Sequence, residues 1–493
     1  MNTFKRKALS CAILGGLGAV AGSAHAVYQN PNGLGQALIY PYYTVQQAGG
    51  NAYNTYLSIV NTTTTGKALK VRFREGKNSR EVLDFNLYMS PNDVWTAAIV
   101  PADATTSSPG HLVTADKSCT NPPIPATGVD FRNIQYSGAN TDNAGTGLDR
   151  TREGYLEVIE MATVTGALLT GITHVNGVPA SCAGVQVVTL PIASLAAPTG
   201  GIAGSYTLIN VQNGADMGGN VTALANFNPA IIYTDLGNEA TNLTSAQPVS
   251  VVVAQQPTGT TTYTNTFAGA TAGVDAVGST IQHSTVINEY VLDSATKSAT
   301  DWVLTFPTKR YYTGAAPAIT PFSNAFVGPG GACETISFQF FDREEGTGTA
   351  AGADFSPTPS VTPNSLCWES TVLSVRNVAS AVATSNVLGS VNTTIVNVAT
   401  GFQNGWARLT FLGTNATTTG ITAATTTSRN VNTGTTSAVA GVFRGLPVIG
   451  FMARTLFNGT LSCTNAAGAT ASCQGSYGSL FDHRFEQNIT PAP

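Results

Sequence analysis

The fold class is decided by one stretch of the sequence, residues 55–100, which reads TYLSIVNTTTTGKALKVRFREGKNSREVLDFNLYMSPNDVWTAAIV. Apolar residues alternate with basic residues from 69 to 74, and a second alternating run covers 82–89. A period of two is typical of a β-strand that buries one face and exposes the other. Segments rich in Asn, Gly, Ser and Pro separate the runs and indicate turns. The stretch therefore predicts three or four consecutive strands.

Short apolar runs separated by polar turns continue along the rest of the chain. One of them, residues 286–292, fits either a strand or a short helix. The first, at 34–45, is interrupted by Pro41, and its three tyrosines suggest an aromatic packing cluster. The other strands are predicted near 154–162, 302–306, 336–341, 393–398, 406–412 and 448–456. Many short strands of this kind favour an all-β fold, an antiparallel β-sandwich or jelly-roll-like core with long inserts rich in Pro, Gly and Thr.

The N-terminus has the features of a secretory signal peptide. A basic cluster precedes an apolar segment, and small residues at 24–26 form a cleavage site. We expect residues 1–26 to be removed, leaving 27–493 as one large discontinuous β-rich domain with inserts at about 103–150 and 313–366. The remaining sequence has no apolar run of the roughly 20 residues that a transmembrane helix needs. The prediction is an exported protein at the cell surface or outside the cell, with the periplasm as the alternative.

Charged residues are scarce in this chain. They make up 10% of the sequence, against about 25% in an average globular protein, and the net charge is −4. Such a weak and slightly acidic balance is not that of a protein that binds nucleic acid. The abundant Thr, Asn, Ser and Gly indicate instead a neutral exterior.

Six cysteines follow the predicted signal peptide. An even number in an exported chain predicts disulfide bonds, and no pair has the close CxxC spacing of a zinc site. Fifteen pairings are formally open. We favour neighbours in sequence because each such pair encloses a loosely patterned segment, which gives the bonds Cys119–Cys182, Cys333–Cys367 and Cys463–Cys473.

A cluster of positive charge marks the central stretch. Six of the 23 basic residues lie between 67 and 80. Lys70, Arg72 and Arg74 share one parity of their predicted strand, opposite the apolar residues, so we expect them to face solvent. Two interpretations stay open. The residues form either a hydrated strand face with local ion pairs or a site that docks an anionic glycan or cell-envelope surface.

No pattern of catalytic or metal-binding residues stands out. The four histidines at 111, 174, 283 and 483 are isolated, and the S-x-x-K match at 294–297 lacks its companion motifs. Glu157 and Glu160 lie three residues apart on a predicted strand, so they point to opposite faces and are not an acid pair. The acidic turn at 342–345 contains an arginine, and residues 142–149 lack the order of a calcium-binding EF-hand loop. We therefore predict no catalytic residue, no metal ligand and no cofactor.

Four blocks of the sequence resemble a family of exported proteobacterial proteins that are described only as cell surface proteins. The blocks are GQALIYPYYTV (35–45), FREGKNSREVLDFNLYMSPNDVW (73–95), WVLTFPTKRYY (302–312), and LPVIGF with YGSLFDHRF (446–451 and 477–485). They cover a minor part of the chain but spread from end to end. The resemblance implies one discontinuous core with variable inserts, and it supplies no catalytic residues.

The expected function is that of a non-enzymatic, secreted or cell-surface structural or adhesive protein that self-assembles or contacts glycans. The alternative is a secreted carbohydrate-active enzyme. Such an enzyme needs two acids that face each other across a groove at about 5–9.5 Å, so the position of the carboxylates discriminates between the two.

Overall fold

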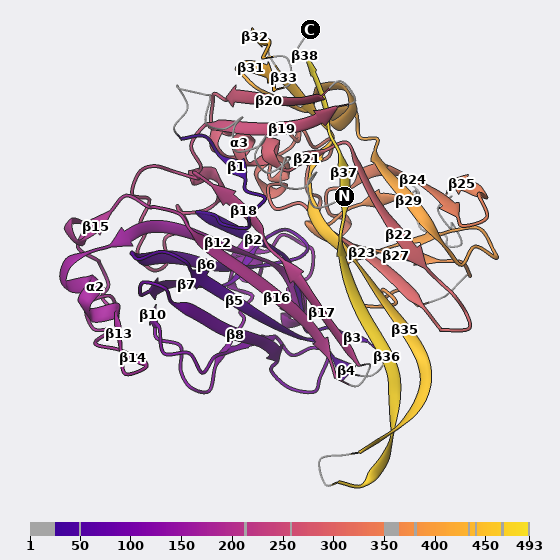
Figure 1. The fold of residues 1–493 in the computed structure, drawn as a ribbon, viewed down its shortest axis with the longest axis horizontal. Helices are drawn as coiled ribbons and strands as arrows, with labels where there is room; N and C mark the ends of the chain where they lie inside the picture. Colours follow the sequence, from indigo (N-terminus) through magenta and orange to yellow (C-terminus); the bar gives the residue numbers. More distant parts are fainter. Residues whose placement is uncertain are drawn as a thin grey trace.

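The computed structural model describes residues 25–48, 51–211, 214–256, 259–349, 364–378, 382–431, 434–438, 441–464 and 468–491. Most of the predicted signal peptide lies outside these ranges. Within them strands predominate over helices and form several antiparallel sheets, so the predicted all-β sandwich-like fold is confirmed (Figure 1). The α-helices in this part are short: α2 (Gly166–Ile172), α3 (Ala272–Thr280) and α4 (Arg310–Thr313). None of them has the length and apolar character required to cross a membrane.

Two antiparallel sheets form a first sandwich from the N-terminal part of the chain. Sheet I has eight strands, in the order β1 (Tyr28–Gln29), β18 (Thr222–Ala225), β2 (Ala37–Thr44), β12 (Glu153–Val164), β6 (Gly66–Glu75), β7 (Glu81–Met89) and β10 (Cys119–Asn121), with β15 (Leu195–Ala196) beside β12. Sheet II has six strands, in the order β11 (Val129–Asp130), β9 (Gly110–Val113), β8 (Val94–Pro101), β5 (Asn54–Asn61), β16 (Ile202–Asn210) and β17 (Ala215–Asn220).

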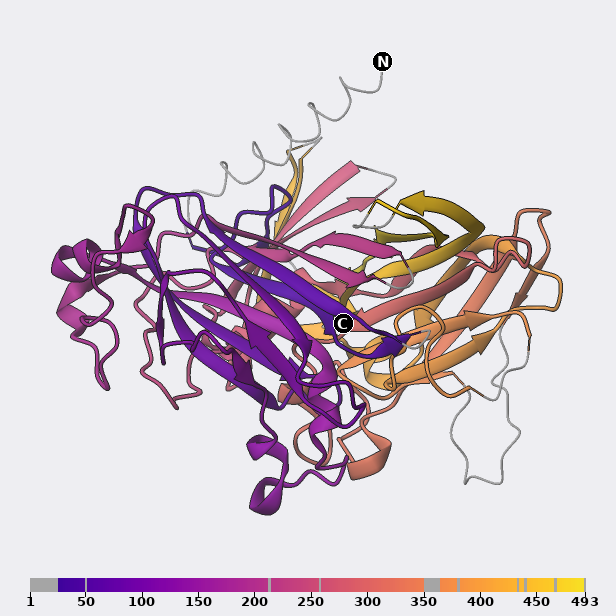
Figure 2. The same ribbon diagram turned by 90° about the horizontal axis from the view of Figure 1, so that it is seen from below.

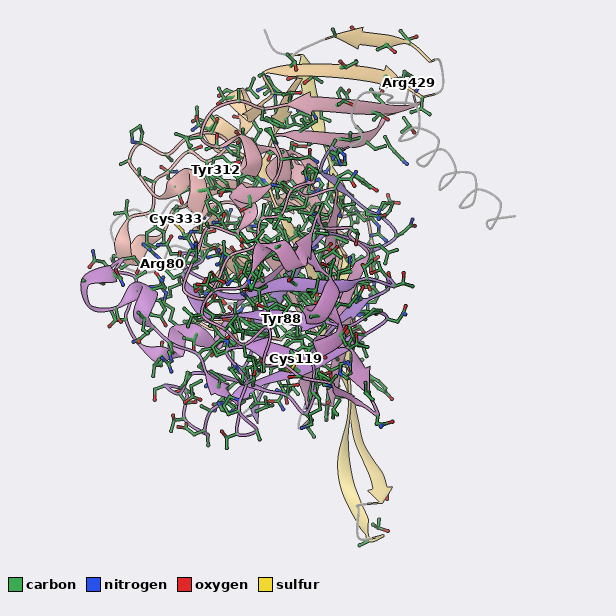
Figure 3. The ribbon with its side chains drawn as sticks, turned by 90° about the vertical axis from the view of Figure 1, so that its left-hand side faces the viewer. Arg80, Tyr88, Cys119, Tyr312, Cys333 and Arg429 are labelled. Carbon is green, nitrogen blue, oxygen red and sulfur yellow. A yellow bond between two sulfur atoms is a disulfide. The ribbon has the colours of Figure 1, made fainter. Side chains whose placement is uncertain are left out.

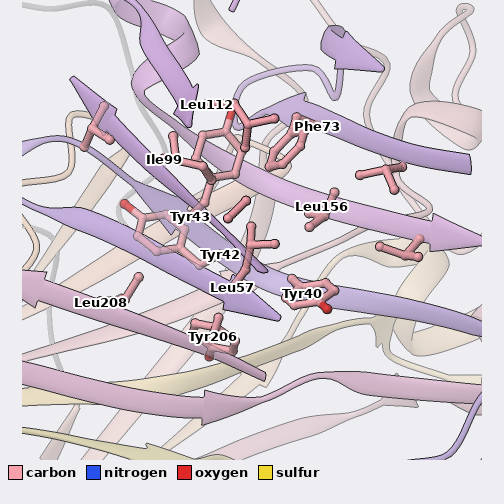
Figure 4. Close-up of a cluster of buried hydrophobic side chains, with 14 of the residues drawn as sticks. Tyr40, Tyr42, Tyr43, Leu57, Phe73, Ile99, Leu112, Leu156, Tyr206 and Leu208 are labelled. Carbon is pink, nitrogen blue, oxygen red and sulfur yellow. The ribbon is translucent and has the colours of Figure 1, made fainter. Parts of the chain in front are cut away.

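The stretch 55–100 supplies four strands to this sandwich, as predicted. Strands β6 and β7 form a hairpin in sheet I, whereas β5 and β8 pair with each other in sheet II. The chain therefore crosses from one sheet to the other and back, which places the apolar face of β6 opposite that of β5. Figure 4 shows the packed interior, in which Phe73 and Leu156 of sheet I lie close to Leu57, Ile99 and other side chains of sheet II.

Strand β2 passes through Pro41 without ending, although the sequence predicted a break there. Its ladder with β12 shifts register between Gly154 and Leu156, which pair with Tyr43 and Tyr40. Proline is tolerated at such an irregularity because no regular ladder bond needs its missing N–H. The predicted aromatic cluster forms: the Tyr43 ring lies 5.8 Å from that of Phe73 and 5.7 Å from that of Phe131.

A second sandwich follows in the C-terminal part. The ambiguous run at 286–292 becomes a strand, β22. Sheet III contains β25 (Thr347–Thr349), β24 (Glu334–Asp342), β29 (Asn404–Phe411), β22 (Thr285–Val291) and β37 (Arg484–Glu486) in that order, with β26 (Ser365–Leu366) beside β24. Sheet IV contains β28 (Thr393–Asn397), β27 (Ser370–Arg376), β23 (Ala299–Thr305), β35 (Ile449–Thr464) and β36 (Thr470–Asp482) in that order. The strands predicted in this half are thus present, as β23, β24, β28, β29 and β35.

Sheet IV is shared by the two sandwiches. Trp302 and Leu304 point towards sheet III, whereas Val303 packs into the interior of the first sandwich. On the neighbouring strand β35, Met452 points towards sheet III and Phe451 packs into the interior of the first sandwich. Figure 2 shows the two sandwiches side by side, the N-terminal one in indigo to magenta and the C-terminal one in orange. The apolar interior is therefore continuous between them.

Two smaller sheets lie together at one end of the molecule (Figure 1), and three two-stranded pairs lie elsewhere along the chain. Sheet V has the order β19 (Val249–Gln256), β20 (Gly259–Thr266), β31 (Thr425–Asn430) and β32 (Thr436–Ala438), and sheet VI the order β30 (Ile421–Thr422), β33 (Gly441–Arg444) and β38 (Asn488–Pro491). Two-stranded pairs are formed by β3 (Gln47–Ala48) with β4 (Asn51–Ala52), β13 (His174–Val175) with β14 (Val178–Pro179), and β21 (Gln282–His283) with β34 (Leu446–Pro447).

Two of the three predicted disulfides are present. Cys119 on β10 is bonded to Cys182, and Cys333 is bonded to Cys367 (Figure 3 labels Cys119 and Cys333). The first bond ties the segment that follows α2 to the edge of sheet I. The side chains of Cys463 and Cys473 lie outside the described residues, so that pairing stays a prediction; the backbone register places these residues opposite Ala471 and Leu461.

Candidate functional site

The outer face of sheet I carries the basic residues that the sequence singled out, but this face is covered. Lys70, Arg72 and Arg74 are at most 2% exposed, so the prediction that they face solvent is wrong. The guanidinium of Arg72 donates to the carbonyl of Thr241 at 2.6 Å, and Arg74 shares the carbonyl of Ser79 with Arg310, so segments around 241 and 310 lie over this face. Alternation was a correct guide to the two faces of β6, but both faces of sheet I are buried.

Each of these cations has a carboxylate partner on a neighbouring strand. The three ion pairs are Lys70 with Asp84 at 3.1 Å, Arg72 with Glu81 at 2.5 Å, and Arg74 with Glu157 at 2.9 Å. Burial raises the pKa of Glu81 to about 7, although Arg72 opposes the shift. Because the charges are both buried and compensated, the structure gives no support to docking of an anionic surface by Lys70, Arg72 and Arg74.

A hydrogen-bonded group around Ser79, the Ser79 cluster, joins distant parts of the chain. The carbonyl of Ser79 accepts from Arg74 at 2.9 Å and from Arg310 at 2.8 Å. Its hydroxyl accepts from Tyr155 at 2.9 Å and donates to Glu369 at 2.9 Å. The cluster thus unites the charged blocks at 73–95 and 302–312. Ser79, Tyr155 and Glu369 are at most 1% exposed, so the cluster is part of the core and has no access to a substrate.

Arg150 organises a second buried group beside the first. Its guanidinium donates to both oxygens of Glu75, at 2.7 and 2.9 Å, and to both oxygens of Asp142, at 2.7 and 2.6 Å. Burial by itself would raise the pKa of Asp142, but hydrogen bonds from Arg150 and Asn78 lower this pKa to about 2. Asp142 is therefore engaged by a cation of the protein itself, which argues against a calcium site at 142–149.

Two of the four histidines, His283 and His483, are buried. Burial lowers the pKa of His283 and of His483 to about 3, so both are neutral at physiological pH. His283 stacks on Phe485, with ring centres 4.0 Å apart. In the ranges that the structure describes, no three His, Cys, Asp or Glu side chains lie close enough together to hold a metal ion.

The outer face of sheet II is the open surface of the first sandwich. Rows of residues cross β16, β5 and β8 on this face: Ser205 pairs with Ser58 and Ser58 with Thr96, while Thr207 pairs with Tyr56 and Tyr56 with Ala98. The two serine hydroxyls are hydrogen-bonded to each other at 2.9 Å. A groove of about 620 Å³ follows these rows and continues to residues 113–115 after β9. We call it the sheet II groove.

The lining of the sheet II groove is hydroxyl-rich and uncharged. Ser, Thr and Ala side chains predominate, and the ring of Tyr56 is 46% exposed among them. Asp116 lies at the edge, where its carboxylate accepts from the backbone N–H of Thr96 at 3.2 Å. An aromatic ring beside hydroxyl donors and acceptors is suited to the apolar face and the hydroxyls of a sugar ring.

Sequence reasoning missed this groove. Tyr56 and Ser58 occupy the polar positions of a predicted strand, where they are indistinguishable from ordinary exposed residues. Only the pairing of three strands, which are far apart in the sequence, assembles their side chains into one surface.

Comparison with protein-family profiles, with curated proteins and with solved structures finds no match to this chain. The resemblance to exported cell surface proteins therefore stays a prediction.

Proposed function

We propose that this chain is a non-catalytic, exported protein of the cell surface that contacts neutral polysaccharide through the sheet II groove. The observation that carries the proposal is the uncharged lining of the groove, with Tyr56 exposed between hydroxyl side chains. A neutral lining matches a neutral glycan, because no charged group has to be desolvated when the two surfaces meet. Asp116 at the edge disfavours an anionic glycan.

The alternative, a carbohydrate-active enzyme, is less well supported by the same surface. A glycosidase needs a facing pair of acids, and no carboxylate lines the sheet II groove. The buried acids of sheet I are engaged elsewhere: Glu157 pairs with Arg74, and Glu160 pairs with Lys67 at 2.8 Å. Glu153 accepts from Tyr42 at 2.6 Å and from the backbone N–H of Val391 at 3.0 Å.

Replacing Tyr56 with Ala is expected to weaken binding of a neutral polysaccharide about tenfold, because the stacking surface and its buried area are lost. Affinity electrophoresis of the mature protein in gels that contain neutral or acidic polysaccharides measures the effect. Trp406→Ala is the matched control, since Trp406 is 39% exposed on sheet III, outside the groove.

Three outcomes of that experiment would contradict the proposal. They are unchanged retardation of Tyr56→Ala, loss of binding in Trp406→Ala, and retention by acidic polysaccharide alone. Release of reducing ends during incubation with a neutral polysaccharide would favour the enzyme instead.

Export is tested by fractionation of cells that produce the full chain. The mature protein is expected at the surface or in the medium, and its N-terminal sequence should begin at Val27. Recovery of a protein that retains residues 1–26 in the cytoplasm would contradict export.

A further inference from the structure

Strands β35 and β36 extend beyond the sheet to which they belong. Strand β35 pairs with β23 only from Ile449 to Thr455, whereas its pairing with β36 continues to Thr464 opposite Thr470. Figures 1 and 3 show the two strands leaving the body of the molecule as a separate hairpin. We call the paired segments 460–464 and 470–474 the projecting ribbon. At about 3.3 Å per residue it reaches roughly 20 Å from the last contact of β35 with the body.

The base of the ribbon is held firmly. The N–H of Phe457 donates to the carbonyl of Thr296 at 2.7 Å, and the ammonium of Lys297 lies 4.7 Å from the centre of the Phe457 ring. Immediately beyond, the ladder shifts register between Phe457 and Thr460, and Gly459 has a φ of +82°. This bulge turns the ribbon away from sheet IV. The direction of the ribbon is therefore set by the fold.

Among the described strands, none pairs with either outer edge of the ribbon. Beyond Phe457, the ladders of the described strand residues join β35 and β36 only to each other. A two-stranded ribbon in water is only marginally stable without a further strand or a covering element. Its outward N–H and C=O groups are a template for another strand.

The sequence of the ribbon lacks the features that normally prevent edge pairing. Natural edge strands are protected by charged residues, especially lysine, or by proline. Residues 455–481 contain no Asp, Glu, Lys, Arg, His or Pro. Two identical ribbons therefore meet without repulsion between like charges.

We propose that the projecting ribbon pairs edge to edge with the ribbon of a second copy of this chain. A two-fold axis allows the same strand edge to pair antiparallel with itself, which produces a four-stranded sheet between the two molecules. The partner is a second copy because it brings the same uncharged edge in the same geometry and needs no further component. This association is separate from the sheet II groove and does not depend on the proposed glycan contact.

Sedimentation velocity of the mature protein at about 1–100 µM is expected to show a reversible equilibrium between monomer and dimer. The double variant Ser462→Lys/Thr470→Lys places lysines at two exposed ribbon positions, and it should raise the dimer dissociation constant at least ~10-fold. The matched control is Thr436→Lys/Ser437→Lys on the exposed edge strand β32, which should leave the dimer unchanged. Circular dichroism verifies that each variant is folded.

Hydrogen exchange locates the contact independently of the variants. The backbone amides at 459–464 and 470–475 should exchange more slowly at high than at low protein concentration. A wild-type protein that stays monomeric, a ribbon variant that dimerises normally, or a control variant that is monomeric would each overturn the proposal. Concentration-independent exchange in the ribbon would overturn it too.

Discussion

Replacing Arg150 with Met is expected to lower the free energy of unfolding by about 3–5 kcal/mol, because it leaves Glu75 as a buried charge without its cation. The side chains of Arg150 and Glu75 are 2% and 0% exposed. Glu75 also accepts from the backbone N–H groups of Lys77 and Asn78, at 2.7 and 2.9 Å, so it holds the turn that carries Ser79. Urea unfolding followed by tryptophan fluorescence measures the change.

The matched control for this variant is Arg408→Met. Arg408 pairs with Glu486 at 2.8 Å, but the two side chains are 40% and 45% exposed. An exposed pair contributes about 0–1 kcal/mol, so the midpoint should change little. If the two variants are destabilised equally, the buried ion pair is not what stabilises this part of sheet I.

Replacing Glu369 with Gln is expected to flatten the pH dependence of stability between pH 4.5 and 7. Burial raises the pKa of Glu369 from 4.5 to about 7, with Lys309 opposing the shift. Between these values the folded protein keeps the proton and the unfolded chain loses it, so the wild-type stability falls as the pH rises. The contribution is on the order of 3 kcal/mol over this range. Gln keeps an oxygen that accepts from Ser79 but does not titrate.

Urea midpoints measured from pH 4.5 to 7.5 test this prediction. Glu344→Gln is the control, because Glu344 is 64% exposed and should leave the profile as in the wild type. A difference between the wild-type and Glu369→Gln midpoints that stays constant over this range would show that Glu369 is ionised in the folded protein.

Much of the fold could be predicted from local pattern. Alternation located β5, β6, β7 and β8, because it depends on residues that are near in sequence. The order of the cysteines along the chain predicted the two disulfides Cys119–Cys182 and Cys333–Cys367. Lys70, Arg72 and Arg74 show that alternation does not predict burial. Their parity on β6 was read correctly, but what covers that face comes from segments around 241 and 310. A sequence pattern distinguishes the two faces of a strand and does not reveal whether a third layer lies over the polar one.

The candidate site was less predictable for a related reason. Tyr56, Ser58 and Ser205 become one surface only through the register of β5 with β16. The clustering of charged residues in the sequence was more informative about the fold than their predicted exposure. Only 10% of the residues are charged, yet basic residues are concentrated at 67–80 and adjacent at 309–310. The Ser79 cluster brings these two segments together.

The hydrogen bond from Ser79 to Glu369 spans 290 residues of sequence, and this has a consequence for the order of events during folding. Arg310 and Glu369 complete the hydrogen bonds of Ser79, so the Ser79 cluster closes only after the second half of the chain has joined the first sandwich. Contacts so distant in sequence make folding slow. A chain that ends before residue 369 therefore lacks the carboxylate that accepts from Ser79, and its Ser79 cluster stays incomplete.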